Sequence, residues 1–332
     1  MSRTLPDFLL PMLRRLADGR FHSGQALGHE YGVSRATVCN LVRMARDMGV
    51  NIHAVQGRGY QMESLVEWLD SEKIQSALGV LASYYHLRIV DATDSTNSLL
   101  MQAAEAGAPD GSVVCAEYQF AGRGRRGRHW HSVLGGSLTF SVLWRFEEGI
   151  AALVGLSLAV GVAMARALNQ HSRYPVKLKW PNDVLVDYRK LAGILVEIQG
   201  DMQGPSFAVV GIGLNVRLPA AQRESIDQAV VDLEEMQVQV DRNSLLATCL
   251  IELKSVMDVM RQDGFSGLRA EWASHHAHAG QPVSLLLPDR QTVEGIACGV
   301  DDTGAFLLQS DNGSCVAYNS GDIRLRPTHP RA

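Results

Sequence analysis

Residues 122–128 read Gly122-Arg123-Gly124-Arg125-Arg126-Gly127-Arg128, and a turn and a strand-like segment, 137–144, follow them. Glycine lets a backbone approach a ligand closely, and arginine carries a permanent charge on a planar group that pairs with carboxylate or phosphate. Because the arginines repel one another, we expect this arginine loop to be mobile until an anion binds. The sequence therefore predicts an anion-binding loop that leads into a strand.

Two other interpretations of the loop remain open. The first is a solvated basic loop or a non-specific nucleic-acid patch. The second is a dinucleotide fingerprint, because Gly122, Gly124 and Gly127 satisfy G-x-G-x-x-G and Glu147 lies about 20 residues further on. That fingerprint must open a helix whose N-terminus holds the pyrophosphate, so the strand that follows disfavours it.

The composition bounds the class of protein. A chain of 332 residues with 46% hydrophobic and 20% charged residues is typical of a soluble globular protein with more than one domain. Scattered cysteines without a C-x-x-C pair fit a reducing cytoplasm better than a disulfide framework or a zinc site. No signal peptide is recognisable, and the apolar run 150–165 is short for a membrane span. We therefore expect a cytoplasmic protein without membrane contact, in which that run is a buried helix.

The N-terminal segment is basic and helical. Residues 1–65 hold eight Arg against five Asp or Glu, although the whole chain has a net charge of −4, which favours nucleic-acid contact by this segment alone. Three helices are predicted, the third capped by Ser34 and ending near Asp47, and two strands follow around Arg58. This pattern predicts a winged helix-turn-helix, although any three-helix packing unit shares its first part. The residues placed to contact DNA are Ser34, Arg35, Thr37, Asn40, Arg43 and Arg58.

The rest of the chain divides once more. Helix and strand patterns alternate from residue 66, and short strands separated by turn signals, typical of a small β-barrel, begin near residue 281. We therefore expect a DNA-binding domain over 1–65, a catalytic domain over 66–278 and a β-barrel over 279–328. Near the second boundary, His275, His276 and His278 lack nearby cysteines, so we expect a surface histidine cluster in preference to a metal site.

Three further segments have the composition of one site. Residues 94–97, Asp-Ser-Thr-Asn, suit recognition of a ureido or amide group, although an ordinary helix N-cap has the same pattern. Pro181 turns the chain so that Asn182 and Asp183 are exposed together, and Lys190 begins an apolar strand. No Ser-His-Asp order or Walker lysine is present. The groups suit the joining of a carboxylate to the α-phosphate of a nucleotide, which needs cations and a divalent metal because both reactants are anions.

In combination these segments resemble the bacterial biotin protein ligases, and the N-terminal residues resemble the DNA-binding head of the repressor-type members. The resemblance runs through the whole chain in order. It rests on residues 34–37, 57–60, 95–97, 116–119, 122–130, 179–183, 190–197, 211–215, 306–308 and 321–323. It implies an α+β fold with a winged helix-turn-helix, a central mixed α/β ligase domain similar to class II synthetases, and a small SH3-like β-barrel.

The resemblance also implies roles for individual residues. Arg123, Arg125 and Lys190 would be the catalytic groups. The biotin-binding residues would be Ser95, Thr96, Asn97, Gln119, Arg123, Gly124, Arg125 and Lys190. The nucleotide-binding residues would be Arg128, Trp130, Asn182, Asp183 and Asn215, with Asp183 as a ligand of Mg²⁺. Phe120 and His129 depart from residues common in relatives, but neither removes a named contact.

The implied reaction has two steps. Biotin and ATP with Mg²⁺ would form biotinyl-5′-AMP, and the biotinyl group would pass to a lysine of biotin carboxyl carrier protein, without a tightly bound prosthetic group. With the adenylate bound, a homodimer would repress transcription at the operator DNA of biotin-synthesis genes. Two alternatives remain open at this point: a transcription factor that only senses the ligand, and a lipoate or octanoate ligase, which would need a deep apolar acyl pocket.

Overall fold

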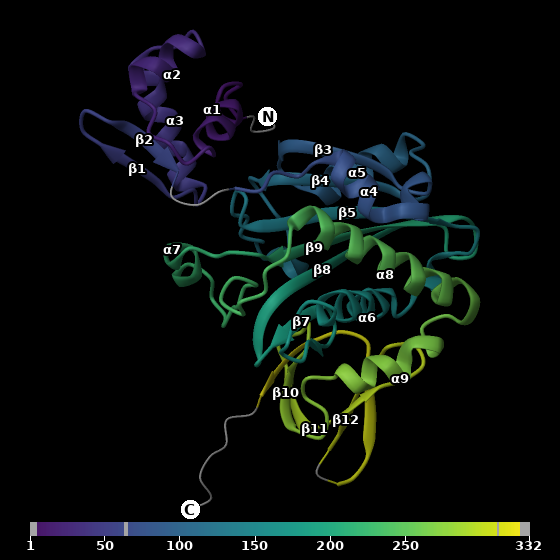
Figure 1. Cartoon of the computed structure of the whole chain (residues 1–332). Helices are drawn as coiled ribbons and strands as arrows, with labels where there is room; N and C mark the ends of the chain where they lie inside the picture. The colour runs from purple at the N-terminus through teal and green to yellow at the C-terminus, as the bar shows by residue number, and fades with distance from the viewer. Residues whose placement is uncertain (1–4, 63–65, 311, 326–332) are drawn as a thin grey trace, which may run out of the picture.

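The computed structural model describes residues 5–62, 66–310 and 312–325. Helices surround three separate sheets in this part of the chain, of two, seven and five strands (Figure 1). This is the α+β class that the sequence predicts. The domain boundary expected at residue 65 lies outside the described residues, as do residues 326–328 at the end of the predicted barrel.

The N-terminal head is a helix-turn-helix followed by a hairpin. Its elements are α1 (Leu9–Leu16), α2 (Gly24–Glu30), α3 (Arg35–Asp47), β1 (Ile52–Val55) and β2 (Gly59–Met62). The Ser34 hydroxyl accepts the backbone N–H of Thr37 at 3.1 Å and so begins α3, as predicted. The apolar stripe of α3 packs into the head's core, while Arg35, Asn40 and Arg43 stay exposed. The predicted winged helix-turn-helix is confirmed.

A mixed seven-stranded sheet forms the centre of the molecule. In spatial order its strands are β3 (His86–Thr93), β4 (Ser112–Gln119), β5 (Ser137–Phe146), β9 (Ser206–Asn215), β8 (Arg189–Gly200), β7 (Asp183–Val186) and β6 (Lys177–Lys179). Only β3 and β4 run parallel, and all other neighbours are antiparallel. Successive side chains of β4 enter different cores, Val113 and Cys115 one and Val114 the other, so both faces of the sheet are covered.

Helices cover this sheet on both faces. Helix α5 (Thr96–Glu105) packs its Leu100 and Ala104 against one face. The larger core on the other face is closed by α4 (Ser71–Leu78), α6 (Leu156–Asn169), α8 (Arg242–Asp263) and α9 (Ser266–His275). The segment Ile150–Asn169 is long and apolar enough to cross a membrane by length and composition alone, but 61% of it is buried inside the structure. It is the core helix that the sequence predicts.

The C-terminal part of the described chain is a five-stranded antiparallel sheet. In spatial order its strands are β13 (Cys315–Tyr318), β12 (Phe306–Gln309), β11 (Thr292–Val300), β10 (Pro282–Leu286) and β14 (Asp322–Leu325). Its apolar side chains belong to the same core as those of the central sheet. The Trp180 indole N–H donates to the Gly304 carbonyl at 2.9 Å and fixes this contact. Closure of the strands into an SH3-like barrel stays a prediction.

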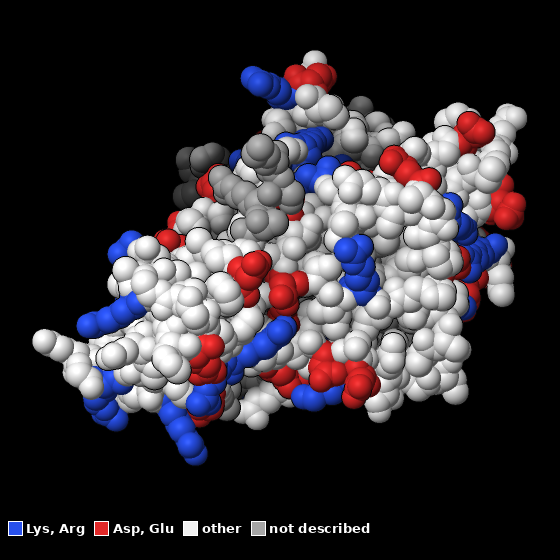
Figure 2. Space-filling model, turned by 90° about the horizontal axis from the view of Figure 1, so that it is seen from above, with Lys and Arg blue, Asp and Glu red and all other residues white. Residues whose placement is uncertain are grey.

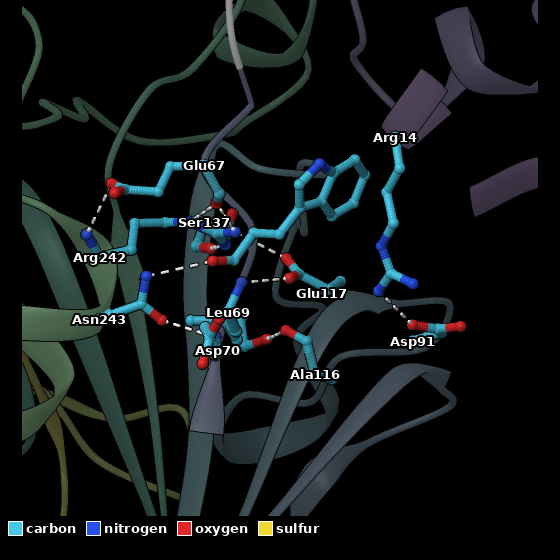
Figure 3. A network of polar contacts seen from close by, with 12 residues as sticks. Arg14, Glu67, Leu69, Asp70, Asp91, Ala116, Glu117, Ser137, Arg242 and Asn243 are labelled. Carbon is cyan, nitrogen blue, oxygen red and sulfur yellow. Dashed lines mark hydrogen bonds and ion pairs between the residues drawn. The ribbon is translucent and has the colours of Figure 1, made fainter. Parts of the chain in front are cut away.

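Two sets of contacts hold the head, and the segment that follows it, on the body. Leu134, which follows the arginine loop, is fully buried in the head's core and donates its N–H to the Met48 carbonyl at 3.1 Å. Below the head, Arg242 pairs with Glu117 at 2.7 Å, and the same carboxylate accepts the Leu69 N–H at 2.6 Å (Figure 3). Because this ion pair is buried and hydrogen-bonded, it holds the segment after the head against the central sheet.

Candidate functional site

A cavity of about 500 Å³ lies between the N-terminus of α5, the arginine loop, the central strands and β14. Sequence reasoning placed thirteen residues in the biotin and nucleotide sites. Twelve of them line this one cavity: Ser95, Thr96, Asn97, Gln119, Arg123, Gly124, Arg125, Arg128, Trp130, Asn182, Asp183 and Lys190. The remaining residue, Asn215, is buried behind it. The structure thus brings together segments that lie far apart in the sequence.

Carboxylates and an amide from other segments contact the arginine loop. Arg123 pairs with Glu197 at 2.7 Å, and Arg125 donates to the Asn182 amide oxygen at 3.4 Å. A single carboxylate of the C-terminal sheet, Asp322, binds both Arg126, at 3.2 Å, and Arg128. Sequence reasoning considered only the repulsion between the arginines, whereas these acidic partners offset it.

Lysines add to the positive charge of the cavity. The Lys190 ammonium pairs with the Asp183 carboxylate at 2.6 Å, and both side chains are largely buried. Lys179 also lines the cavity, and burial lowers the pKa of its ammonium. Burial likewise lowers the pKa of the Arg125 guanidinium, which remains charged because the ordinary pKa of arginine lies far above neutrality. The site is therefore a partly desolvated cluster of cations, able to bind an anion strongly.

Bare backbone on two strands makes room for an indole ring. A Cβ atom at Gly213 would lie 2.3 Å from the Trp130 ring, and one at Gly193 would lie 3.3 Å from it. The Lys190 ammonium is 6.0 Å from the centre of the same ring, within reach of a cation–π interaction. Trp130 thus rests on β8 and β9 inside the cavity, where only glycine permits it.

The other end of the cavity is neutral and polar. Ser95 caps α5, because its hydroxyl accepts the Ser98 N–H at 3.5 Å, so the N-cap interpretation of this segment is also correct. The next residues, Thr96 and Asn97, are buried and face the cavity. Gln119 on β4 accepts the Thr96 backbone N–H at 2.7 Å. This end can exchange hydrogen bonds with a neutral ring, as residues 94–97 predict.

Asn215 and the histidines lie differently from what the sequence suggests. The Asn215 amide donates to the backbone carbonyls of Lys190 and Val231, at 3.2 and 3.1 Å, so it holds the strand that carries Lys190. The expected surface histidine cluster is wrong for His276 and His278, which are 5% and 3% exposed. Burial lowers the pKa of each to about 4, so both rings are neutral. His276 packs near Trp272 and Phe306, and His278 packs near Tyr188, contacts that local sequence cannot reveal.

The donors of the cavity fit a metal ion that is shared with a bound nucleotide. In the described ranges, no three His, Cys, Asp or Glu residues are grouped so that they could hold a metal ion. Asp183 is a single carboxylate, already paired with Lys190. Mg²⁺ commonly takes one or two protein carboxylates together with the phosphates of a nucleotide. The donors present fit that arrangement and no dedicated protein cage.

Comparison with known proteins identifies the family. The model of the "Biotin/lipoate A/B protein ligase family" matches residues 89–215, that of the "Biotin protein ligase C terminal domain" matches residues 278–326, and that of the "HTH domain" matches residues 9–61. The "Bifunctional ligase/repressor BirA" of Salmonella typhimurium is 37% identical over 317 residues, which cover 96% of this chain and 97% of that protein. The chain belongs to the biotin protein ligase family.

Other members agree with this assignment. The "Biotin--[acetyl-CoA-carboxylase] ligase" of Mycobacterium tuberculosis is 34% identical, over 77% of this ligase and 95% of its own length. The structure of the "Biotin protein ligase from Aquifex aeolicus in complex with biotin and ATP" superposes with a TM-score of 0.61 at 28% identity. That match covers 73% of this ligase and 98% of that chain. The predicted family and the predicted order of head, ligase domain and β-rich C-terminal domain are confirmed.

Among the residues in or beside the cavity that sequence reasoning left without a role are Lys179, Asp322 and Glu197. Lys179 lay in a recognised motif but was not assigned to the cavity, although its neighbours Asn182 and Asp183 were. Asp322 lay in a segment recognised only as part of the C-terminal domain, and Glu197 closed another motif without a role. A search for carboxylates to balance the four arginines of the loop could have suggested the last two.

Proposed function

We propose that this ligase forms biotinyl-5′-AMP from biotin and ATP, transfers the biotinyl group to a lysine of biotin carboxyl carrier protein, and represses transcription with the adenylate as corepressor. The observation that carries this proposal is one cavity with a neutral polar end and a cationic end. Biotin has the same division, because a cyclic urea lies at one end and a carboxylate at the other. The relatives named as ligases, repressors and complexes with biotin and ATP support both activities.

In the first step, the cationic residues bring two anions together. Arg123, Arg125 and Lys190 neutralise the biotin carboxylate and the α-phosphate of ATP, with Gly124 allowing close approach. A carboxylate oxygen then forms a bond to the α-phosphorus, the bond to the bridging oxygen breaks, and pyrophosphate leaves with that electron pair. Asp183 would help to hold the Mg²⁺ that accompanies ATP, and the ion would neutralise further phosphate charge.

In the second step, the neutral amine of the carrier lysine attacks the acyl carbon of the adenylate. The oxygen of that carbonyl becomes negative, and AMP then leaves as the amide forms and the amine loses a proton. Lys190 and Arg125 are the charges that can stabilise the oxyanion. No protein nucleophile is needed, because the mixed anhydride is already reactive.

The nucleotide occupies the cationic end of the cavity. Arg128 faces its phosphates, Asn182 and Asp183 lie beside them, and the Trp130 ring offers an apolar surface. Asn215 acts indirectly, through its hydrogen bond to the Lys190 carbonyl. Ser95, Thr96, Asn97 and Gln119 bind the ring of biotin at the neutral end.

The head binds operator DNA of biotin-synthesis genes, and the adenylate-bound ligase does so as a homodimer. Exposed α3 residues Arg35, Asn40 and Arg43 support this role, with Thr37 beside the cap Ser34 and Arg58 on the hairpin. Seen from above, small groups of Lys and Arg lie near Asp and Glu on a surface that is mostly neither (Figure 2), so we assign DNA contact to particular arginines of the head. We place the DNA-binding domain at 1–65, the catalytic domain at 66–278 and the C-terminal domain at 279–328, in a cytoplasmic protein.

Biotin-dependent exchange of labelled pyrophosphate into ATP tests the first half-reaction. We expect exchange with biotin and none with lipoate or octanoate, and transfer of labelled biotin to carrier protein in a second assay. Arg125→Ala should release the adenylate faster than wild type. A ligase that exchanges with lipoate but not with biotin would overturn the proposed substrate.

The repressor role needs a separate measurement. Binding to DNA that contains the operator should tighten when biotin and ATP are added together, and sedimentation should show a dimer under the same conditions. Unchanged operator affinity with both ligands would rule out the adenylate as corepressor, and it would leave the ligase reaction untouched.

A further inference from the structure

A continuous chain of polar contacts runs from the arginine loop to the neutral end of the cavity. Its members are mostly buried, and one of them, Ser141 on β5, is fully buried and does not line the cavity. In order, the chain is Arg123, Glu197, Asn97, Ser141, Thr96 and Gln119. Neither Ser141 nor Glu197 has a role in the function proposed above.

Glu197 fixes the orientation of the Asn97 amide. A carboxylate paired with Arg123 at 2.7 Å is ionised and can only accept, so the Asn97 Nδ2 atom must face it, at 2.8 Å. The second Nδ2 hydrogen goes to the Leu195 carbonyl at 3.2 Å. The amide oxygen therefore turns the other way. It lies so close to β9 that a Cβ atom at Gly211 would be 2.1 Å from it.

The Ser141 hydroxyl has one hydrogen to donate, and two acceptor atoms of other residues lie within hydrogen-bond distance. Its Oγ lies 2.6 Å from Asn97 Oδ1 and 2.8 Å from Thr96 Oγ1. The Thr96 hydroxyl can donate to Gln119 Oε1 at 3.1 Å, but that oxygen already accepts the Thr96 backbone N–H at 2.7 Å. The Thr96 hydrogen is therefore available to a ligand at little cost. Ser141 can then donate to Asn97 Oδ1 or to Thr96 Oγ1, whichever of the two receives no hydrogen bond from the ligand.

We propose that Ser141 and Glu197 are positioning residues that set the hydrogen-bond polarity of the cavity for a ring with adjacent C=O and N–H groups. The ring carbonyl accepts from the Thr96 hydroxyl, and the ring N–H donates to Asn97 Oδ1. The Ser141 hydroxyl turns from Asn97 to Thr96, so every buried group keeps a partner. This inference rests on the proposed function, in which the ring is the cyclic urea of biotin.

The test is a thermodynamic cycle, in which a change in the protein and a change in the ligand are made separately and together, and their effects on Kd are compared. The protein changes are Ser141→Ala and Glu197→Gln, and the ligand change replaces the ureido oxygen of biotin by sulfur, a weaker acceptor. Calorimetry gives Kd for biotin and for the thiocarbonyl analogue with each variant. Thr139→Val is the matched control, because it removes another buried hydroxyl of β5, which donates to the Ala116 carbonyl at 3.1 Å outside the cavity.

Ser141→Ala should leave Kd for biotin within about threefold of wild type, because its hydrogen bond is lost both from the free protein, where it serves Asn97, and from the complex, where it serves Thr96. KM for ATP should stay near that of wild type. The penalty for sulfur should be about tenfold in wild type and Thr139→Val, but below about threefold in Ser141→Ala, because the two changes act on the same hydrogen bonds. Glu197→Gln should reduce the penalty less than Ser141→Ala does, because a glutamine no longer requires Asn97 Nδ2 to face it, whereas the Leu195 carbonyl still does.

An equal sulfur penalty in wild type, Ser141→Ala and Glu197→Gln overturns the proposal, even if the variants bind biotin more weakly. Ser141→Cys, with a weaker donor of similar shape, provides the same comparison if Ser141→Ala does not fold. Failure of the proposed function is distinguishable, because wild type would then show no biotin-dependent pyrophosphate exchange.

Discussion

The ligase has two arginine-rich regions, and they differ in what the guanidinium groups contact. In the arginine loop, Arg123, Arg126 and Arg128 pair with carboxylates from distant segments. In the head, Arg14 and Arg15 also pair with carboxylates, but of the arginines assigned to DNA, Arg43 contacts the Asn40 amide at 3.3 Å and Arg58 lies 4.1 Å from the centre of the Phe21 ring. Paired arginines hold a shape into which a small anion can fit. Arginines that contact only neutral groups keep their charge for a phosphate backbone.

The largest effect should come from removing the central cation of the cavity. Lys190→Ala should lower kcat/KM for adenylate formation by about 100-fold or more, the scale of losing one preorganised donor to developing charge. The measurement is biotin-dependent pyrophosphate exchange. Binding of the unliganded head to DNA should not change, because Lys190 lies in the body.

Lys177→Ala is the matched control for that experiment. Lys177 lies on β6, which is separated from the Lys190 strand by β7, and donates to the Ser274 carbonyl at 3.2 Å, outside the cavity. Its removal should leave exchange within about twofold. Equal losses for the two lysines would mean that charge near the sheet, and not position in the cavity, governs the reaction.

Acid should weaken the body through His276 and His278. Their pKa is about 4 in the folded chain and about 6.5 when unfolded. Between these values the unfolded chain binds more protons, so stability is present above pH 6.5 and is lost as pH falls toward 4. Each imidazole should cost about 3 kcal/mol by pH 4. Urea unfolding at pH 7 and pH 4.5, followed by the fluorescence of the buried tryptophans, measures the loss.

The double variant His276→Phe/His278→Phe separates this effect from the titration of carboxylates. Both rings are buried, His276 near Trp272 and Phe306 and His278 near Tyr188, where an apolar ring of similar size can pack. We expect the variant to lose several kcal/mol less than wild type between the two pH values. A variant as acid-sensitive as wild type would assign the loss to other groups.

The two regions also differ in how far sequence could predict them. The head follows from local signals, because the Ser34 cap, the apolar stripe of α3 and the turn around Arg58 all involve residues close in the chain. The motifs of the cavity were equally visible. The partners of the loop were not, because Glu197 and Asp322 come from strands whose register with the loop is set by the whole fold. His276 and His278 were misplaced for the same reason.

Removal of an arginine from the head should have a smaller effect, confined to DNA. Arg43→Ala should weaken DNA binding about tenfold and lower the slope of log affinity against log salt by about one, as expected for one lost phosphate contact. Arg15→Ala is a suitable control, since Arg15 is already paired with Asp18 and Glu30. Pyrophosphate exchange should not change in either variant. A slope unchanged by Arg43→Ala would remove Arg43 from the DNA contact.

The smallest effect should come from making the loop resemble the head. Asp322→Asn keeps the shape of the side chain but removes the charge that Arg126 and Arg128 share, so the loop loses its tie to β14 and the two guanidinium groups become free. Because the Asp322 carboxylate is about one quarter exposed, its pairs are partly screened by solvent. We expect the adenylate to dissociate about fivefold faster, measured by stopped-flow fluorescence of Trp130, with kcat for its formation little changed.

Asp302→Asn is the control, because Asp302 belongs to the same domain as Asp322 and its carboxylate pairs with Arg269 at 3.0 Å. This variant should leave the release of the adenylate unchanged. Slower release in Asp322→Asn would reverse the comparison, because it would show that unpaired arginines hold the adenylate better than a preformed loop does.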